Sequence, residues 1–113
     1  MTYNLKFHPD ALKEWEGLSA ADKSYFKKKL KQRLENPHIP GSKLSGGHNL
    51  YKIKRMRPPL RLTYHADDQN IVVTALSVGR RDSDVYTEMI KRYEKGNSYT
   101  SASIGPSKAG PLK

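Results

Sequence analysis

The sequence contains no cysteine, so neither a disulfide nor a thiolate contributes to its stability or its chemistry. This absence fits a reducing cytoplasm, where we expect the protein to act. No apolar run approaches the ~18 residues that a membrane-spanning helix needs, and the first residues lack the apolar core of a signal peptide. We therefore expect no membrane partner.

Acidic residues are scarce: 11 Asp and Glu stand against 21 Lys and Arg, and the formal net charge is +10 over 113 residues. Such a balance predicts a polyanionic partner, nucleic acid first, an acidic protein second and a membrane surface third. A soluble surface with surplus lysine is the plain alternative. The length fits one domain, expected at residues 1–95, and the composition of residues 96–113 predicts a disordered tail.

Hydrophobic periodicity predicts an α+β protein with the order strand, helix, helix, strand, strand, strand, helix. We expect an antiparallel sheet with the N-terminal helix pair on one face and a groove on or at the rim of the other. The predicted elements begin with a strand at 3–7, a helix from Ala11 capped by Asp10 and ended by Gly17, and a second helix that follows a capping pattern at Ser19 and runs to about Glu35. They continue with strands at about 49–54, 59–66 and 71–78, and a helix capped by Ser83 or Asp84 and closed by Gly96.

Cations are concentrated in the first hairpin of this sheet. From Gly41 to Ala66 there are six Lys or Arg residues and no acid. Strand alternation places Lys52 and Lys54 on one face of the first hairpin strand, and Arg61 on one face of the second. If the strands pair, three like charges share a small area of sheet, which costs free energy. A protein that holds a phosphate there has a reason to bear this cost.

Further residues of the same kind follow the third strand. Arg80 and Arg81 leave the sheet, and Tyr86 lies just inside the last helix. We place Ser77 and Gly79 under the same groove, although one β-bulge would change the register. Arginine binds phosphate oxygens bidentately, a tyrosine ring can stack on a base, and a sheet groove accommodates single-stranded RNA.

Metal-free RNA cleavage needs a base for the 2′-hydroxyl, charge neutralisation at phosphorus and a proton for the leaving oxygen. Neighbouring cations favour the neutral form of a lysine, so Lys52 or Lys54 is the better candidate for the base. A paired-histidine ribonuclease is the lesser alternative, because the four histidines are scattered: His8, His38, His48 and His65. We expect no metal and no cofactor. The lysine run of the second helix, 23–33, either faces nucleic acid or is a solvated face.

Several pieces of the chain resemble the RelE family of toxins from bacterial type II toxin–antitoxin systems. The match extends over residues 1 to about 95. Its pieces are Ala11–Trp15, Lys27–Leu30, Lys43 and Leu44 with Gly46, Tyr51–Lys54, Arg61 and Leu62 with Tyr64, Ser77–Gly79 followed by Arg81, Val85 with Tyr86, and Lys91 with Arg92.

The resemblance implies a ribosome-dependent endoribonuclease that cuts messenger RNA in the ribosomal A site and leaves a cyclic phosphate. It assigns the base to Lys54, charge stabilisation to Arg61, leaving-group protonation to Arg81 and substrate stacking to Tyr86, with Lys52 beside them. It also implies a small acidic antitoxin of the RelB kind and operator DNA binding only through the antitoxin complex. We expect further contacts to messenger or 16S rRNA from Lys13, Lys27, Lys28, Lys43, Arg55, Arg57 and Arg80.

Two features depart from the family pattern: Tyr86 follows Arg81 at a slightly shorter interval, and Pro58-Pro59 stiffen the hairpin turn. Two other functions stay open. ParE-like toxins share the fold and inhibit DNA gyrase, but they lack the lysine–arginine cluster. A module that only binds RNA or an antitoxin would need none of its cations individually.

Overall fold

The computed structural model describes residues 2–44 and 48–94. The elements are β1 (Asn4–Phe7), α1 (Pro9–Glu16), α2 (Ala20–Glu35), a short 3-10 helix η1 (Pro40–Ser42), β2 (Leu50–Arg55), β3 (Leu60–Asp67), β4 (Val72–Arg80) and α3 (Val85–Glu94). This is the predicted element order. The predicted closing residue Gly96 and the tail 96–113 lie outside the described residues. No helix in the described part is long and apolar enough to cross a membrane.

The four strands form one sheet in the order β1-β4-β3-β2. Strands β2, β3 and β4 make the predicted antiparallel meander. Strand β1 joins the edge beside β4, also as predicted, but it runs parallel to β4. The sheet is therefore mixed rather than wholly antiparallel, because a four-residue strand pattern carries no information about direction.

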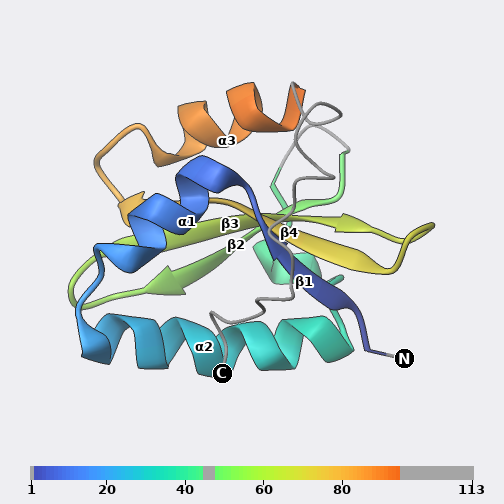
Figure 1. Ribbon diagram of the computed structural model, residues 1–113, viewed down its shortest axis with the longest axis horizontal. Coiled ribbons are helices and arrows are strands. Elements are labelled where there is room, and N and C mark those ends of the chain that lie inside the picture. Colours follow the sequence, from blue (N-terminus) through green and yellow to red (C-terminus); the bar gives the residue numbers. More distant parts are fainter. Residues whose placement is uncertain (1, 45–47, 95–113) are drawn as a thin grey trace.

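Helices cover both faces of the sheet (Figure 1). The main core lies between the sheet and the helix pair α1 and α2, which contribute Trp15 and Phe26 against Leu62 and Tyr64. The prediction that this pair shares one face is confirmed. Helix α3 lies over the other face, above a smaller buried cluster of Leu50, Leu76 and Met89. The face predicted to hold a groove is thus largely covered by α3.

The ends of α1 differ slightly from the prediction. The helix begins at Pro9, and its cap is His8 rather than the predicted Asp10. The Nδ1 atom of His8 accepts the backbone N–H of Asp10 at 3.0 Å. Proline suits the first helical position because its missing N–H would lack a helical partner there. Gly17 ends the helix as predicted.

The starts of the other two helices follow side-chain hydrogen bonds. Ser19 caps α2 as predicted, its Oγ accepting the N–H of Asp22 at 3.1 Å. Before α3, the Ser83 hydroxyl donates to the carbonyl of Arg80 at 2.7 Å, which tightens the turn that leaves the sheet. The first residue of α3 is Val85, directly after Asp84.

A β-bulge between β3 and β4 decides which side chains share a face. The pairing register shifts between the consecutive β3 residues Thr63 and Tyr64, which face Ser77 and Ala75. Ser77 and Gly79 lie opposite Thr63 and Arg61, whereas Ala75 belongs to the main core on the other face. The predicted alternation from 71 to 79 therefore holds for Ser77 and Gly79 and breaks at Ala75, since an extra residue reverses the alternation.

Candidate active site

The sheet register aligns the predicted cations in two neighbouring rows. Lys54, Arg61 and Gly79 are partners across β2, β3 and β4, and so are Lys52, Thr63 and Ser77 in the next row. Partners across adjacent strands lie on the same face, and strands are about 4.8 Å apart. The pairing of the predicted hairpin is thus confirmed, and its three cations share one face.

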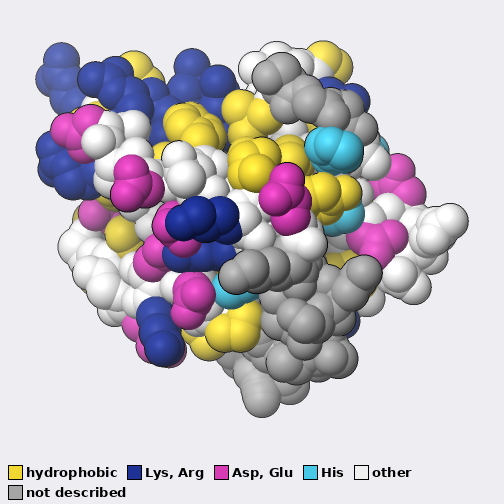
Figure 2. All heavy atoms as spheres, turned by 90° about the horizontal axis from the view of Figure 1, so that it is seen from above, with side chains coloured by type: hydrophobic (Ala, Val, Ile, Leu, Met, Phe, Trp, Pro, Cys, Tyr) yellow, Lys and Arg dark blue, Asp and Glu magenta, His cyan; other side chains and the backbone are white. Residues whose placement is uncertain are grey.

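Arg81 extends this group beyond the end of β4. Its N–H donates to the carbonyl of Pro59 at 2.8 Å, next to the pair formed by Leu60 and Arg80. We name Lys52, Lys54, Arg61 and Arg81 the cation cluster. Figure 2 shows Lys and Arg gathered at one end of the α3 side of the molecule, beside a band of hydrophobic side chains.

Burial and pairing distinguish the members of the cation cluster. Arg61 is only 6% exposed, whereas Lys54 and Arg81 are exposed. The Arg61 guanidinium donates to the carbonyl of Leu60 at 2.9 Å. None of the ion pairs among residues 2–44 and 48–94 includes a member of the cluster. Four cations, one of them buried, therefore lack a described carboxylate to neutralise them.

Tyr86 reaches this face from the first turn of α3. It is half-buried and packs against the cluster of Leu50, Leu76 and Met89. The start of the helix is fixed to the sheet by buried hydroxyls. Ser77 Oγ donates to the carbonyl of Val85 at 2.8 Å and lies 2.6 Å from Thr63 Oγ1.

The direction of this hydroxyl pair follows from its contacts. Because Ser77 uses its hydrogen on Val85, Thr63 is the donor to Ser77. Both side chains are fully buried. The row that contains Lys52 therefore also anchors the turn of helix that carries Tyr86.

Helix α2 supports β2 from its free edge, which the sequence analysis did not foresee. Tyr25 donates its hydroxyl hydrogen to the carbonyl of Lys54 at 2.8 Å, and Arg33 donates to the carbonyl of Lys52 at 3.4 Å. Arg33 also donates to the hydroxyl of buried Tyr64 at 2.9 Å. In the sequence Arg33 is one cation of the lysine run, and only the tertiary structure distinguishes it from its solvated neighbours.

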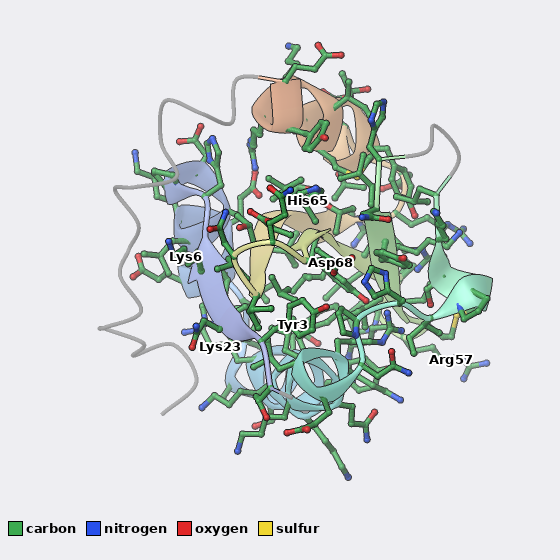
Figure 3. The ribbon with its side chains drawn as sticks, turned by 90° about the vertical axis from the view of Figure 1, so that its right-hand side faces the viewer. Tyr3, Lys6, Lys23, Arg57, His65 and Asp68 are labelled. Carbon is green, nitrogen blue, oxygen red and sulfur yellow. The ribbon has the colours of Figure 1, made fainter. Side chains whose placement is uncertain are left out.

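The remaining predicted binding residues fall into different places. Lys13 lies on α1, and Lys27 and Lys28 lie on α2. Lys43 and Arg57 are exposed, and Arg57 projects from the β2–β3 turn (Figure 3).

Arg80 and Arg55 already have carboxylate partners. Exposed Arg80 forms a 3.4 Å ion pair with Asp82. Arg55 forms a 2.9 Å ion pair with Asp22, and its guanidinium lies 4.6 Å from the centre of the Tyr25 ring. The Arg55 charge is thus partly neutralised by its neighbours.

The histidines lie outside the cation cluster. His38 lies between the Tyr51 hydroxyl, 2.7 Å from Nδ1, and the Asp68 carboxylate, 2.8 Å from Nε2. The Tyr3 hydroxyl also donates to Asp68, on the α2 side of the sheet (Figure 3). These hydrogen bonds, from Tyr3 first and then from His38, lower the pKa of Asp68.

His48 and His65 both lie against the ring of Tyr93, on the α3 side of the sheet. His65 is four residues along β3 from Arg61, about 14 Å at the usual rise of a strand. Burial lowers the pKa of His65. The two histidines nearest each other are therefore remote from the buried arginine.

Known proteins resemble this chain in both sequence and fold. Residues 5–85 match the family model described as the ParE toxin of the type II toxin–antitoxin system parDE. The mRNA interferase toxin RelE of Escherichia coli K12 is 44% identical over 93 residues, 81% of this chain and 98% of that protein. A RelE-like toxin protein of E. coli is 46% identical over 87 residues, 76% of this chain and 92% of the relative.

Solved structures agree with the sequence matches. A mutant of the E. coli toxin RelE in the free state is 43% identical with a TM-score of 0.77, covering 81% of this chain and 98% of that one. The intact E. coli RelBE toxin–antitoxin complex gives 41% identity and a TM-score of 0.69, over 72% of this chain and 99% of that one.

The fold and the family model together define a toxin of the type II toxin–antitoxin class. Within that class, the chain belongs to the RelE family, whose relatives here are named mRNA interferases. An endoribonuclease activity and an antitoxin partner follow at the level of the family.

Proposed function

We propose that this protein is a ribosome-dependent endoribonuclease that cleaves messenger RNA in the ribosomal A site, in the cytoplasm, without a metal. One observation carries the proposal. Arg61 is 6% exposed, stands in a row with Lys54 and has no described carboxylate partner. A buried, unpaired cation is costly to the fold, and an RNA phosphate would supply the missing anion.

The cation cluster offers the groups that attack by the 2′-hydroxyl requires. Lys54, exposed at the end of its row, acts as the base, with Lys52 two residues away on the same face. Arg61, held in the floor of the cluster, stabilises the negative charge that develops on the phosphate in the transition state, because its donors are already fixed in place. Arg81 donates a proton or hydrogen bond to the leaving 5′-oxygen, and Tyr86 stacks on a base of the messenger.

We further propose that the ribosome itself orients the messenger, because the exposed part of the cluster, Lys54 and Arg81, is small. The exposed lysines of the helix pair, with Lys43 and Arg57, would contact 16S rRNA, to which a net charge of +10 is suited. An acidic antitoxin of the RelB kind would neutralise the same charges. Operator DNA would be bound only by the toxin–antitoxin complex.

The test is primer extension on a messenger translated in a purified system, with the wild type, Arg81→Ala and Lys91→Ala. Lys91 is exposed on α3 and serves as a charge-matched control. We expect codon-phased cuts that require ribosomes. Arg81→Ala should reduce the rate by about 10²–10³-fold, as removal of one transition-state donor does, and Lys91→Ala should stay within about twofold.

Two further readings sharpen this test. Attack by the 2′-hydroxyl leaves a 2′,3′-cyclic phosphate and a 5′-hydroxyl. A nuclease that uses water as the nucleophile leaves a linear phosphate and no cyclic one. Ribosome co-sedimentation should show that Arg81→Ala still binds. Intact messenger combined with loss of gyrase supercoiling would instead indicate a ParE-like function, and graded, salt-sensitive binding without cuts would indicate a binding module.

A further inference from the structure

Glu14, on α1, joins three elements although it lies outside the cation cluster. Its Oε1 atom accepts the N–H of Val78 on β4 at 3.1 Å and a hydrogen from Arg92 Nη1 on α3 at 2.9 Å. Its Oε2 atom accepts from Arg92 Nη2, also at 2.9 Å. This two-pronged geometry is the strongest form of an arginine–carboxylate pair.

Arg92 is held from other directions as well. Its side chain is 9% exposed and donates to the carbonyl of Leu76 at 2.8 Å. Glu88, one turn earlier on α3, lies 3.3 Å from Nη2. Glu88 belongs to the same helix as Arg92, whereas Glu14 and the Leu76 carbonyl attach this arginine to α1 and β4.

The attachment matters because the apolar support of α3 is small. Among the described residues, the buried cluster beneath it consists of Leu50, Leu76 and Met89, with partly buried Leu44, Tyr86 and Tyr93 packed against it. The main core lies on the opposite face of the sheet. Removing one partner of a buried ion pair leaves the other charge uncompensated, which costs far more than an exposed pair contributes. The Glu14–Arg92 pair is therefore a major restraint on where α3 lies.

Tyr86 depends on the same restraint. It stands six residues before Arg92, about 9 Å along the helix axis at the usual rise of 1.5 Å per residue. Without Glu14 the Arg92 end of α3 is released while Ser77 still holds the helix at Val85. The helix would then turn about its start and reorient the Tyr86 ring relative to Lys52 and the rest of the cluster.

We propose that Glu14 is a positioning residue for the cation cluster: through Arg92 it holds α3 where Tyr86 can stack on the substrate. The proposal rests on the proposed function, since it assigns Tyr86 a role in cleavage. Glu14 itself does not contact the reacting atoms.

The first experiment compares Glu14→Gln with Glu88→Gln. Both variants remove one carboxylate from Arg92, but the ion pairs of Glu88 within the described residues are with Lys91 and Arg92, both on α3 itself. Amide hydrogen exchange of residues 85–94 should rise about tenfold or more in Glu14→Gln and stay within about twofold in Glu88→Gln. In the cleavage assay, the single-turnover rate at saturating ribosomes should fall about tenfold in Glu14→Gln, with the half-saturating ribosome concentration little changed.

A second experiment asks whether the effect passes through Tyr86. Tyr86→Leu keeps apolar packing but removes the stacking ring. If Glu14 acts through Tyr86, adding Glu14→Gln to Tyr86→Leu should lower the cleavage rate no further. A full additional tenfold loss would overturn the proposal.

Other results would also overturn it. One is unchanged α3 exchange in Glu14→Gln. Another is faster exchange in every element with a matching fall in Tm, because that pattern marks a general structural role. If the wild type itself leaves the messenger uncut, the proposed function fails, and the exchange comparison alone decides whether Glu14 holds α3.

Discussion

Replacing Arg61 with methionine should stabilise the protein while it abolishes cleavage. Arg61 is 6% exposed and no described carboxylate neutralises it. Methionine fills a similar volume without a charge, so the variant keeps the packing of β3 and removes the desolvated cation.

The magnitude follows from three contributions. Desolvation of the guanidinium costs roughly 3 kcal/mol after relaxation. Repulsion from Lys54 adds about 1 kcal/mol, because that lysine is exposed and screened by solvent. The hydrogen bonds to the carbonyls of Leu60, at 2.9 Å, and Arg55, at 3.5 Å, together return about 2 kcal/mol. Removing all three should stabilise the fold by about 2 kcal/mol, which raises Tm by about 4–8 °C per kcal/mol for a domain of this size.

The assay is urea unfolding at a constant m-value, with Arg92→Met as the matched control. Arg92 is also buried, at 8% exposure, but it is paired with Glu14 and Glu88. Its removal takes the partner from the Glu14 and Glu88 carboxylates, which are about a third exposed, and should lower the free energy of unfolding. Two buried arginines in one small domain should thus respond to the same substitution with opposite signs.

The reasoning is refuted if Arg61→Met lowers the unfolding midpoint as Arg92→Met does. That outcome would mean that the hydrogen bonds of Arg61 to main-chain carbonyls contribute more free energy than its desolvation costs. The arginine would then be a structural residue of the hairpin and not a phosphate-binding residue. Cleavage lost together with stability would then say nothing about catalysis.

Two further predictions concern polar groups that are buried or partly buried. Ser77→Ala should lower the free energy of unfolding in urea by about 1–3 kcal/mol, because it leaves the Thr63 hydroxyl without its acceptor. Adding Thr63→Val should lower it little further, and two additive losses would contradict this coupling. Burial lowers the pKa of both His65 and His8, so the unfolded chain binds more protons than the folded one below the ordinary histidine pKa of about 6.5. Stability should be complete above that pH and fall below it; Tm measured from pH 7.5 to 5.5 should drop less in His65→Gln than in the wild type, and an equal drop would reject this account.

Local chemistry made much of the fold predictable. Two patterns depend only on the periods of strands and helices: the alternation over Tyr51–Lys54 and Arg61–Tyr64, and the helical spacing around Trp15. Each of these elements forms where the sequence predicts it. The hairpin that joins Lys54 to Arg61 follows from their closeness in the chain. The resemblance to the RelE family likewise needed only residue types at particular spacings.

Tertiary structure decided the rest, because those features depend on contacts between distant segments. The bulge that separates Ser77 from Ala75, the parallel direction of β1 and the place of α3 over the sheet involve no local pattern. A sequence shows Arg61, Arg80 and Arg92 as equivalent charges. Only the folded chain shows that Arg92 has Glu14 and Arg80 has Asp82, while Arg61 is buried without a described carboxylate, because pairing and desolvation are properties of position in space.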